Sequence, residues 1–218
     1  MFPKRLSDGY QAFLDGRFHN ERKRYEVLAE SGQNPEILLI GCCDSRVSPE
    51  VIFDAGPGEM FVIRNVANLV PPYEGDSRSS SYHGTSAAIE FAVNALQVKH
   101  IVVLGHASCG GVRAVFDDAK PLTQIDFVGK WVSQITPVAA SLQRTGDRTT
   151  DIRRLEWAVV EHSLTNLLTF PSIRQRVEQG DLELHGTYFG VATGLLFLRD
   201  PRTGEFAPCQ SQVPDAAT

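Results

Sequence analysis

The segment ILLIGCCDSRV, residues 37–47, gives the strongest indication of the fold, because an apolar run of this kind is typical of a buried parallel strand. Reactive side chains follow the run directly. The segment IVVLGHASCGG, residues 101–111, has the same organisation. In open α/β sheets the carboxyl ends of parallel strands border the ligand-binding crevice. We therefore expect these two strand ends to lie side by side and to form one site.

The rest of the chain alternates between short apolar runs and segments with helical spacing. Strands are expected at residues 36–42, 60–64, 101–104, 182–191 and 195–198, and helices at residues 49–56, 85–96, 110–118, 127–142, 152–168 and 172–179. Residues 65–81 are rich in Pro, Ser and Asn, which predicts a loop. This order of elements predicts an α/β fold with a central, mostly parallel β-sheet flanked by helices.

The chain is expected to form a single domain over residues 1–218, because a chain of 218 residues can bury a substantial core. Residues 1–33 are polar with apolar positions spaced by about three or four. This spacing predicts an N-terminal helical arm that packs outside the sheet core, with Asn20 as the cap of its second helix and Gly32 as its end. Residues 207–218 are expected to form a loose tail.

Composition and charge favour a small-molecule substrate. Hydrophobic residues make up 42% of the chain and charged residues 22%, as in soluble globular proteins, and the net charge of −5 argues against a nucleic-acid partner. The N-terminus lacks the apolar stretch of a signal peptide, and no apolar run approaches the roughly 18 residues that span a bilayer. We therefore expect a cytoplasmic protein with neither nucleic-acid nor membrane partners.

The four cysteines, at positions 42, 43, 109 and 209, are too few and too irregularly spaced for a disulfide scaffold. Cys42 and Cys43 are candidates for a redox dithiol. Adjacent residues at a strand end point to opposite faces, however, so both would reach one substrate only with a turn between them. Arg46 follows these cysteines too closely for the phosphate-binding loop of a cysteine phosphatase.

A zinc site accounts for more of these residues. His106 and Cys109 are separated by two residues after a strand, a spacing that lets both side chains turn toward one ion. Cys42 supplies a third ligand from the neighbouring strand end. Three protein ligands leave one position open, as in catalytic zinc sites. A structural zinc site and ordinary buried residues are the alternatives, and the charged pair Asp44 and Arg46 is either part of the site or a structural ion pair.

The two motifs together resemble the β class of carbonic anhydrases, in which C-x-D-S-R is followed much later by H-x-x-C-G-G. In this chain the motifs are CCDSR at residues 42–46 and HASCGG at residues 106–111. The similarity runs from about residue 33 to residue 111 and continues more weakly over residues 163–171. The resemblance implies an enzyme, a zinc lyase with a plant-like pocket pattern. Hydrolases of carbonyl sulfide and carbon disulfide are similar as well.

The resemblance implies that Cys42, His106 and Cys109 hold Zn²⁺ with water or hydroxide in the remaining position. Bound zinc lowers the pKa of its water from about 15.7 toward 7. The hydroxide then attacks carbon dioxide reversibly to give bicarbonate and a proton. Asp44 is implied to accept the hydroxide's hydrogen bond, and Arg46 to keep Asp44 ionised. A carbonyl sulfide or carbon disulfide hydrolase and a non-catalytic zinc or thiol sensor are the alternatives.

The resemblance also implies a small substrate pocket. Carbon dioxide has no dipole and tolerates an apolar wall, whereas bicarbonate needs hydrogen-bond donors. The implied pocket consists of the donors Gln33 and backbone Gly110 and of an apolar wall of Val47, Phe61, Val66 and Phe91. Phe91 stands where plant-like members often have Tyr, so a contact from that hydroxyl is absent.

Two further expectations concern the assembly and the proton path. The resemblance implies a homodimer whose interface completes each pocket, either alone or as the unit of a tetramer or octamer. His83 lies in a loop near the expected site and is the best candidate for a proton shuttle.

Overall fold

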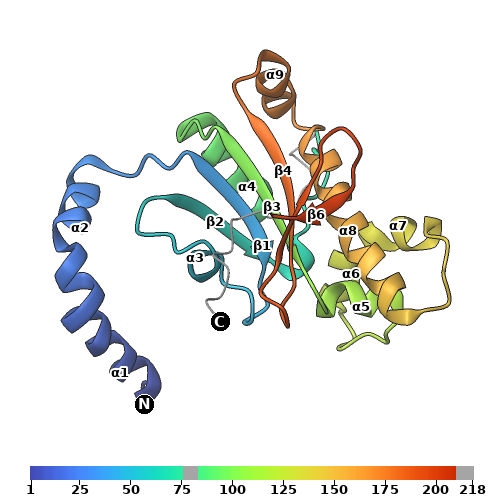
Figure 1. Ribbon diagram of the computed structural model, residues 1–218, viewed down its shortest axis with the longest axis horizontal. Coiled ribbons are helices and arrows are strands. Elements are labelled where there is room, and N and C mark those ends of the chain that lie inside the picture. Colours follow the sequence, from blue (N-terminus) through green and yellow to red (C-terminus); the bar gives the residue numbers. More distant parts are fainter. Residues whose placement is uncertain (76–82, 210–218) are drawn as a thin grey trace, which may run out of the picture.

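A computed structural model describes residues 1–75 and 83–209 of the chain. Its centre is a sheet with the strand order β2-β1-β3-β4-β5-β6 (Figure 1). The first four strands pair in parallel, whereas β5 and β6 add an antiparallel edge. The strands are β1 (Ile37–Cys42), β2 (Met60–Asn65), β3 (His100–His106), β4 (Glu183–Phe189), β5 (Leu196–Arg199) and β6 (Phe206–Pro208). The predicted α/β fold with a mostly parallel sheet is confirmed.

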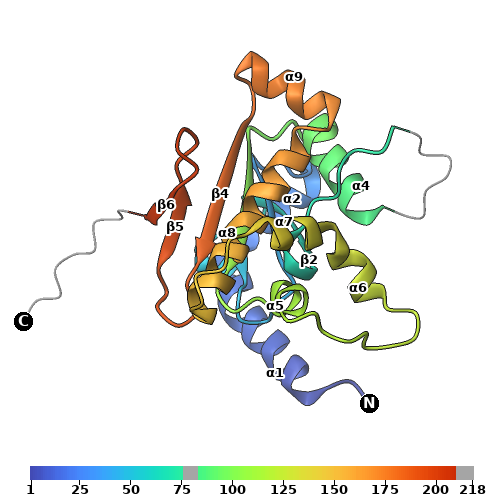
Figure 2. The same cartoon turned by 90° about the vertical axis from the view of Figure 1, so that its right-hand side faces the viewer.

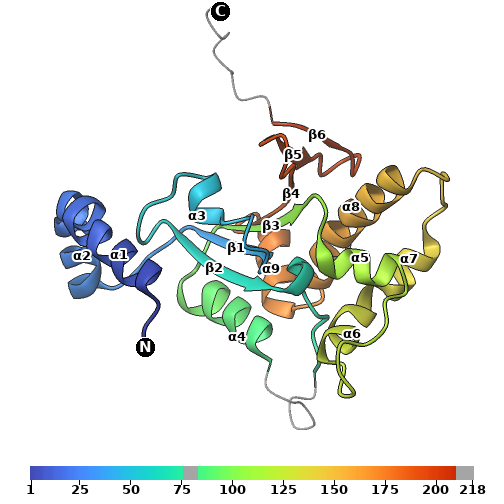
Figure 3. The ribbon, with the colours of Figure 1, turned by 90° about the horizontal axis from the view of Figure 1, so that it is seen from below.

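Helices cover the two faces of the sheet unequally. Three helices, α4 (Gly84–Glu90), α8 (Arg148–Leu167) and α9 (Pro171–Gln179), lie on one face, and the short α3 (Pro49–Ile52) lies on the other (Figure 3). The core on the helical face contains Leu38, Ile40, Ile101 and Val103 from the strands and Ile89, Val160, Leu164 and Ile173 from the helices. Leu39 and Leu104 alternate with these residues and pack on the opposite face, so β1 and β3 are buried on both sides.

The N-terminal arm is one long helix that stands away from the sheet (Figure 1). It consists of α1 (Lys4–Phe13), a π-helical turn (Leu14–Phe18) and α2 (His19–Ser31), and it contains no buried residue. The arm ends at Gly32, whose φ of 79° is favourable for glycine. The prediction of helices outside the sheet core is confirmed. Asn20, which we expected to begin a second helix, lies inside the continuous helix.

The predicted helix over residues 127–142 is wrong, because the segment is broken. It forms α6 (Phe127–Val132), a 3₁₀ turn (Ser133–Ile135) and α7 (Thr136–Ser141). Inside a helix, Pro137 would lack a backbone N–H to donate and its ring would clash with the preceding turn. It therefore stands at the start of α7. The predicted helix over residues 85–96 begins at Gly84 and passes into a π-helical turn, Phe91–Ala95.

The remaining differences are at element ends. α3 stops at Ile52, short of Gly56, and α5 (Gly110–Phe116) stops just before Asp117. β6 includes the first residues of the segment that we expected to be a loose tail, and it pairs with β5 in the hairpin at the sheet edge (Figure 2). Residues 210–218 of that tail and residues 76–82 of the predicted loop lie outside the described residues. No helix of the described chain is both long and apolar enough to cross a membrane.

Candidate metal centre

The two motif segments meet at the carboxyl ends of β1 and β3. These strands are parallel neighbours in which Gly41 is paired with Leu104, so the residues that follow both strands emerge at the same edge. Cys42 ends β1, His106 ends β3, and Cys109 caps the start of α5. All three side chains are buried, and their potential ligand atoms lie within 4.8 Å of one another.

The geometry of this cluster fits a zinc ion. The Cys42 and Cys109 Sγ atoms are 3.9 Å apart, close to the roughly 3.8 Å that two Zn–S bonds of about 2.3 Å subtend in a tetrahedral site. His106 Nδ1 lies 3.0 Å from the Ala107 carbonyl oxygen and donates to it. His106 Nε2 is buried without a hydrogen-bond partner among the described residues, so its lone pair is available to a metal.

The two thiols of the cluster affect each other's pKa. The neighbouring Cys109 thiol, together with His106, lowers the pKa of Cys42. The same contact, reinforced by burial, raises the pKa of Cys109. Ionisation of one thiol therefore opposes ionisation of the other, and a bound cation would offset both charges.

Asp44 and Arg46 form a two-pronged ion pair beside the cluster. Arg46 Nε and Nη2 donate to the two Asp44 carboxylate oxygens at 2.9 and 2.7 Å, and the Arg46 backbone N–H donates to Oδ1 at 3.0 Å. The Arg46 side chain holds the pKa of Asp44 well below its ordinary range. Arg46 also donates to the Ser108 carbonyl oxygen at 3.1 Å, which ties the first motif loop to the second.

Arg64 supports the first loop from β2. Its guanidinium donates to three backbone carbonyl oxygens, those of Cys42 at 2.8 Å, Asp44 at 2.7 Å and Val47 at 2.9 Å. Sequence reasoning did not assign this role. The available signal was a single charged residue that follows four apolar residues in the strand MFVIRN.

A buried carboxylate supports the second loop. Glu156 on α8 is 3% exposed, and it accepts hydrogen bonds from the Cys109 backbone N–H at 2.9 Å and from the Tyr188 hydroxyl at 2.7 Å. Burial raises the pKa of Glu156 and, together with the Glu156 contact, that of Tyr188. Glu156 was missed from the sequence because its position on α8 is separated from Cys109 by 47 residues.

The six residues of the implied pocket lie in different places. Val66 packs on the buried cluster that contains Cys42 and Cys109, and with Gly110 it lines a cavity of about 410 Å³. Val47 packs against Leu39 and Leu104 on the other sheet face. These positions bring Val66 and Gly110 next to the candidate metal ligands Cys42 and Cys109.

The other implied pocket residues lie farther out. Phe61 and Phe91 contact each other with ring centroids 5.7 Å apart, and Phe91 is 48% exposed. Gln33 is exposed and follows the end of the N-terminal arm. Within the described part of one chain, these side chains are not part of the buried cluster.

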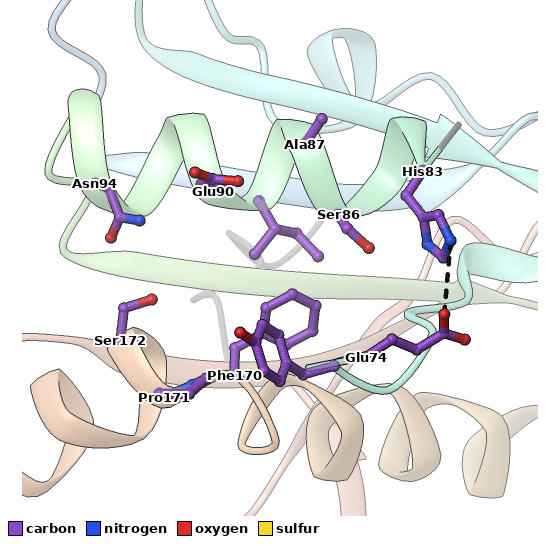
Figure 4. Close-up of a pocket in the computed structure, with 11 residues that line it drawn as sticks. Glu74, His83, Ser86, Ala87, Glu90, Asn94, Phe170, Pro171 and Ser172 are labelled. Atoms are coloured by element: carbon purple, nitrogen blue, oxygen red, sulfur yellow. Dashed lines mark ion pairs between the residues drawn. The ribbon is translucent and has the colours of Figure 1, made fainter. Parts of the chain in front are cut away.

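His83 lines a different cavity, of about 520 Å³, between α4 and the start of α9 (Figure 4). Its Nε2 lies 3.8 Å from a carboxylate oxygen of Glu74. None of the three candidate metal ligands lines this cavity. The role of His83 as a proton shuttle stays a prediction.

Comparisons with known proteins agree with the sequence motifs. The family model described as carbonic anhydrase matches residues 37–196. A carbonic anhydrase of Synechocystis is 33% identical over 213 residues, which cover 96% of this chain and 76% of the relative. The solved β-carbonic anhydrase CcaA is 31% identical with a TM-score of 0.84 and covers 96% of this chain and 92% of its own.

One solved relative is described as an assembly. The tetrameric β-carbonic anhydrases of the filamentous ascomycete Sordaria macrospora are represented by a chain that is 29% identical with a TM-score of 0.74. The alignment covers 93% of this chain and 96% of that one. The resemblance that the two motifs indicated is confirmed, and with it the prediction of an enzyme of the lyase class.

Proposed function

The chain belongs to the β-class carbonic anhydrase family, and on this premise we propose that it catalyses the reversible hydration of carbon dioxide to bicarbonate and a proton. The observation that carries the proposal is the buried Cys42–His106–Cys109 cluster with the Asp44–Arg46 pair beside it. A metal ligand set and an oriented carboxylate in the same two loops are what a hydration reaction requires.

Zn²⁺ is the proposed cofactor, held by Cys42 Sγ, His106 Nε2 and Cys109 Sγ. When bound, zinc supplies a water whose pKa is lowered toward about 7 and which is therefore a nucleophile at neutral pH. Glu156 and Arg64 support the proposal, because they fix the backbone of Cys109 and Cys42 through hydrogen bonds.

Asp44 is proposed to orient the nucleophile. Its carboxylate stays ionised because Arg46 donates two hydrogen bonds to it, so it accepts a hydrogen bond from the attacking water and directs a lone pair toward the carbon of carbon dioxide. The contact between Arg46 and the Ser108 carbonyl oxygen fixes the pair relative to the second loop. Arg46 is thus a positioning residue for Asp44.

The substrate pocket is proposed to begin at Val66 and Gly110. The Val66 side chain offers an apolar surface beside the cluster, which suits carbon dioxide, and the Gly110 backbone N–H is free of an intrahelical partner at the start of α5, which suits bicarbonate. From the family resemblance we add Gln33, Val47, Phe61 and Phe91 to this pocket. The exposure of Gln33 and Phe91 is consistent with a pocket completed by a second subunit.

We propose a homodimer as the basic unit, alone or within a tetramer or octamer, and a location in the cytoplasm. The N-terminal arm supports a partner subunit, because it has no buried residue and exposes Leu6, Tyr10 and Val27. The tetrameric Sordaria relatives support it as well. Sedimentation of the full chain tests the assembly.

Stopped-flow hydration of carbon dioxide tests the proposed reaction. We expect rapid hydration by the protein with zinc, loss of activity after chelation and recovery when Zn²⁺ alone is returned. Carbonyl sulfide and carbon disulfide are assayed in parallel. Hydrolysis of either without hydration of carbon dioxide, or zinc binding without turnover, would contradict the proposal.

A further inference from the structure

A second cluster of metal-ligand side chains lies at the opposite end of the sheet from Cys42, His106 and Cys109. His100, Glu183 and His185 present a ligand atom each, and these atoms lie within 4.8 Å of one another. His100 begins β3, and the other two residues begin β4 next to α9 (Figure 1). These side chains take no part in the proposed hydration site.

The strand register explains why the three side chains converge. β3 and β4 run in parallel with His100 paired with Glu183 and Val102 paired with His185. Residues two apart on a strand point to the same face, so His185 stands on the same face as Glu183 and His100. The cluster is therefore held by two hydrogen-bonded strands.

The distances match those of a first-row metal site. His100 Nδ1 and His185 Nε2 are 3.2 Å apart, and a Glu183 carboxylate oxygen lies 3.7 Å from His185 Nε2. Bonds of about 2.0–2.1 Å in a tetrahedral site place neighbouring ligand atoms about 3.3–3.4 Å apart. Binding an ion requires the loss of the hydrogen bond between His100 and His185, together with a shift of the exposed Glu183 side chain.

We propose that His100, Glu183 and His185 form a second metal site, which binds Zn²⁺ or a similar divalent transition-metal ion and clamps β3 to β4. Two imidazoles and a carboxylate select zinc, nickel and copper over magnesium and calcium, which prefer ligand sets made of oxygen alone. Three protein ligands leave a fourth position for water.

The charges around the cluster permit a cation. Glu36 offsets the charge of the Lys99 ammonium, and hydrogen bonds to the carbonyl oxygens of Val93 and Val98 hold the charged Arg176 guanidinium in place. Burial, together with the nearby His100, lowers the pKa of His185, which favours the neutral imidazole that binds metals.

A hydrated ion reaches the cluster directly from solvent. The side chains of Glu183 and His185 are 67% and 40% exposed. His100 and Glu183 also line an open depression of about 540 Å³ at the amino ends of their strands. A metal ion can therefore enter this site without passing the carboxyl end of the sheet.

Equilibrium dialysis against Zn²⁺, followed by metal analysis, tests the second site. The unmodified protein is expected to bind a second zinc equivalent with lower affinity than the first. His100→Gln and His185→Gln should lose that equivalent while keeping the first. Glu183→Gln should weaken its binding at least about tenfold, because even indirect metal contacts contribute 10- to 100-fold to affinity. His19→Gln, an exposed histidine on the arm, is the matched control and should bind both equivalents.

Thermal unfolding gives an independent readout. Saturating Zn²⁺ should raise the melting temperature of the unmodified protein beyond the value with the first site filled. The increment should be smaller in Glu183→Gln, whose exposed side chain is not needed for folding and whose second site binds zinc more weakly. Cys42→Ser should still bind zinc at the second site, so failure at one site is distinguishable from failure at the other. A single zinc equivalent in the unmodified protein, or a second one retained by both histidine variants, would overturn the proposal.

Discussion

Each end of the sheet carries three possible metal ligands, two sulfurs and an imidazole at the carboxyl end and two imidazoles and a carboxylate at the amino end. At the carboxyl end, Cys42, His106 and Cys109 are at most 6% exposed, and Arg64 and Glu156 fix the backbone around them. At the amino end, the His100, Glu183 and His185 side chains are exposed or half-buried. The two ends therefore differ in burial and in supporting hydrogen bonds as well as in ligand type. We propose that these differences suit the carboxyl end to chemistry and the amino end to reversible binding.

The largest effect is expected from removing a ligand at the carboxyl end. Cys42→Ser should lose tightly bound zinc and reduce hydration at least about 1,000-fold, because a metal contributes several kcal/mol and each 1.36 kcal/mol is about tenfold. Cys43→Ser is the matched control, since Cys43 is exposed and lies outside the cluster. Metal analysis and stopped-flow hydration measure both. Equal activity in Cys42→Ser and Cys43→Ser would mean that the buried cluster is not needed for hydration. The carboxyl end would then not differ from the amino end in function.

The next largest effect is expected at Asp44. Asp44→Asn keeps the side-chain shape and leaves the three metal ligands in place, but it removes the charged acceptor. We expect about a 100-fold loss of hydration activity with zinc retained, the size typical for the loss of one oriented polar group in an active site. Unchanged turnover would show that the Asp44–Arg46 contact is a structural ion pair only.

Glu156 tests whether the supporting layer matters. Glu156→Ala leaves the Cys109 N–H and the Tyr188 hydroxyl without their buried acceptor, at about 1–3 kcal/mol for each group. Urea unfolding should show this loss in the free energy of unfolding, and zinc affinity should fall in parallel. Glu156→Gln retains an acceptor oxygen and should recover most of both. A variant whose zinc affinity is unchanged despite lower stability would show that Glu156 supports only the fold.

The smallest effect is expected at the amino end. His100→Gln should change hydration by less than roughly twofold, which is about 0.4 kcal/mol in activation free energy, because His100 begins β3 at the opposite end from the proposed hydration site and contacts none of its ligands. Stopped-flow hydration at saturating zinc measures this difference. A large loss would mean that the two ends of the sheet are coupled.

The carboxyl end could be predicted from the sequence because its signals are local. Each ligand group directly follows an apolar run, and a parallel sheet places such strand ends together. The burial of β1 and β3 could be predicted as well, because an apolar run is also a local signal. The family resemblance then supplied roles that spacing alone does not give.

The amino-end cluster and the contacts that support the candidate metal centre depend on pairings between residues that are remote in the sequence. His100 and His185 are 85 residues apart, and only the register of β3 with β4 brings them into contact. The contact between Glu156 and Cys109 likewise follows from the packing of α8 against the neighbouring strands and α5. The helix break at Pro137 could have been predicted from the sequence, because proline cannot continue a helix.

At the carboxyl end we expect one zinc ion bound by two sulfurs and one imidazole, with an open fourth position. X-ray absorption at the zinc edge measures this coordination directly, and the His185→Gln protein with one zinc equivalent keeps the amino-end cluster from contributing. We predict two sulfur ligands at about 2.3 Å and nitrogen or oxygen ligands at about 2.0–2.1 Å. A zinc shell without sulfur, or one made of four sulfurs, would contradict the account.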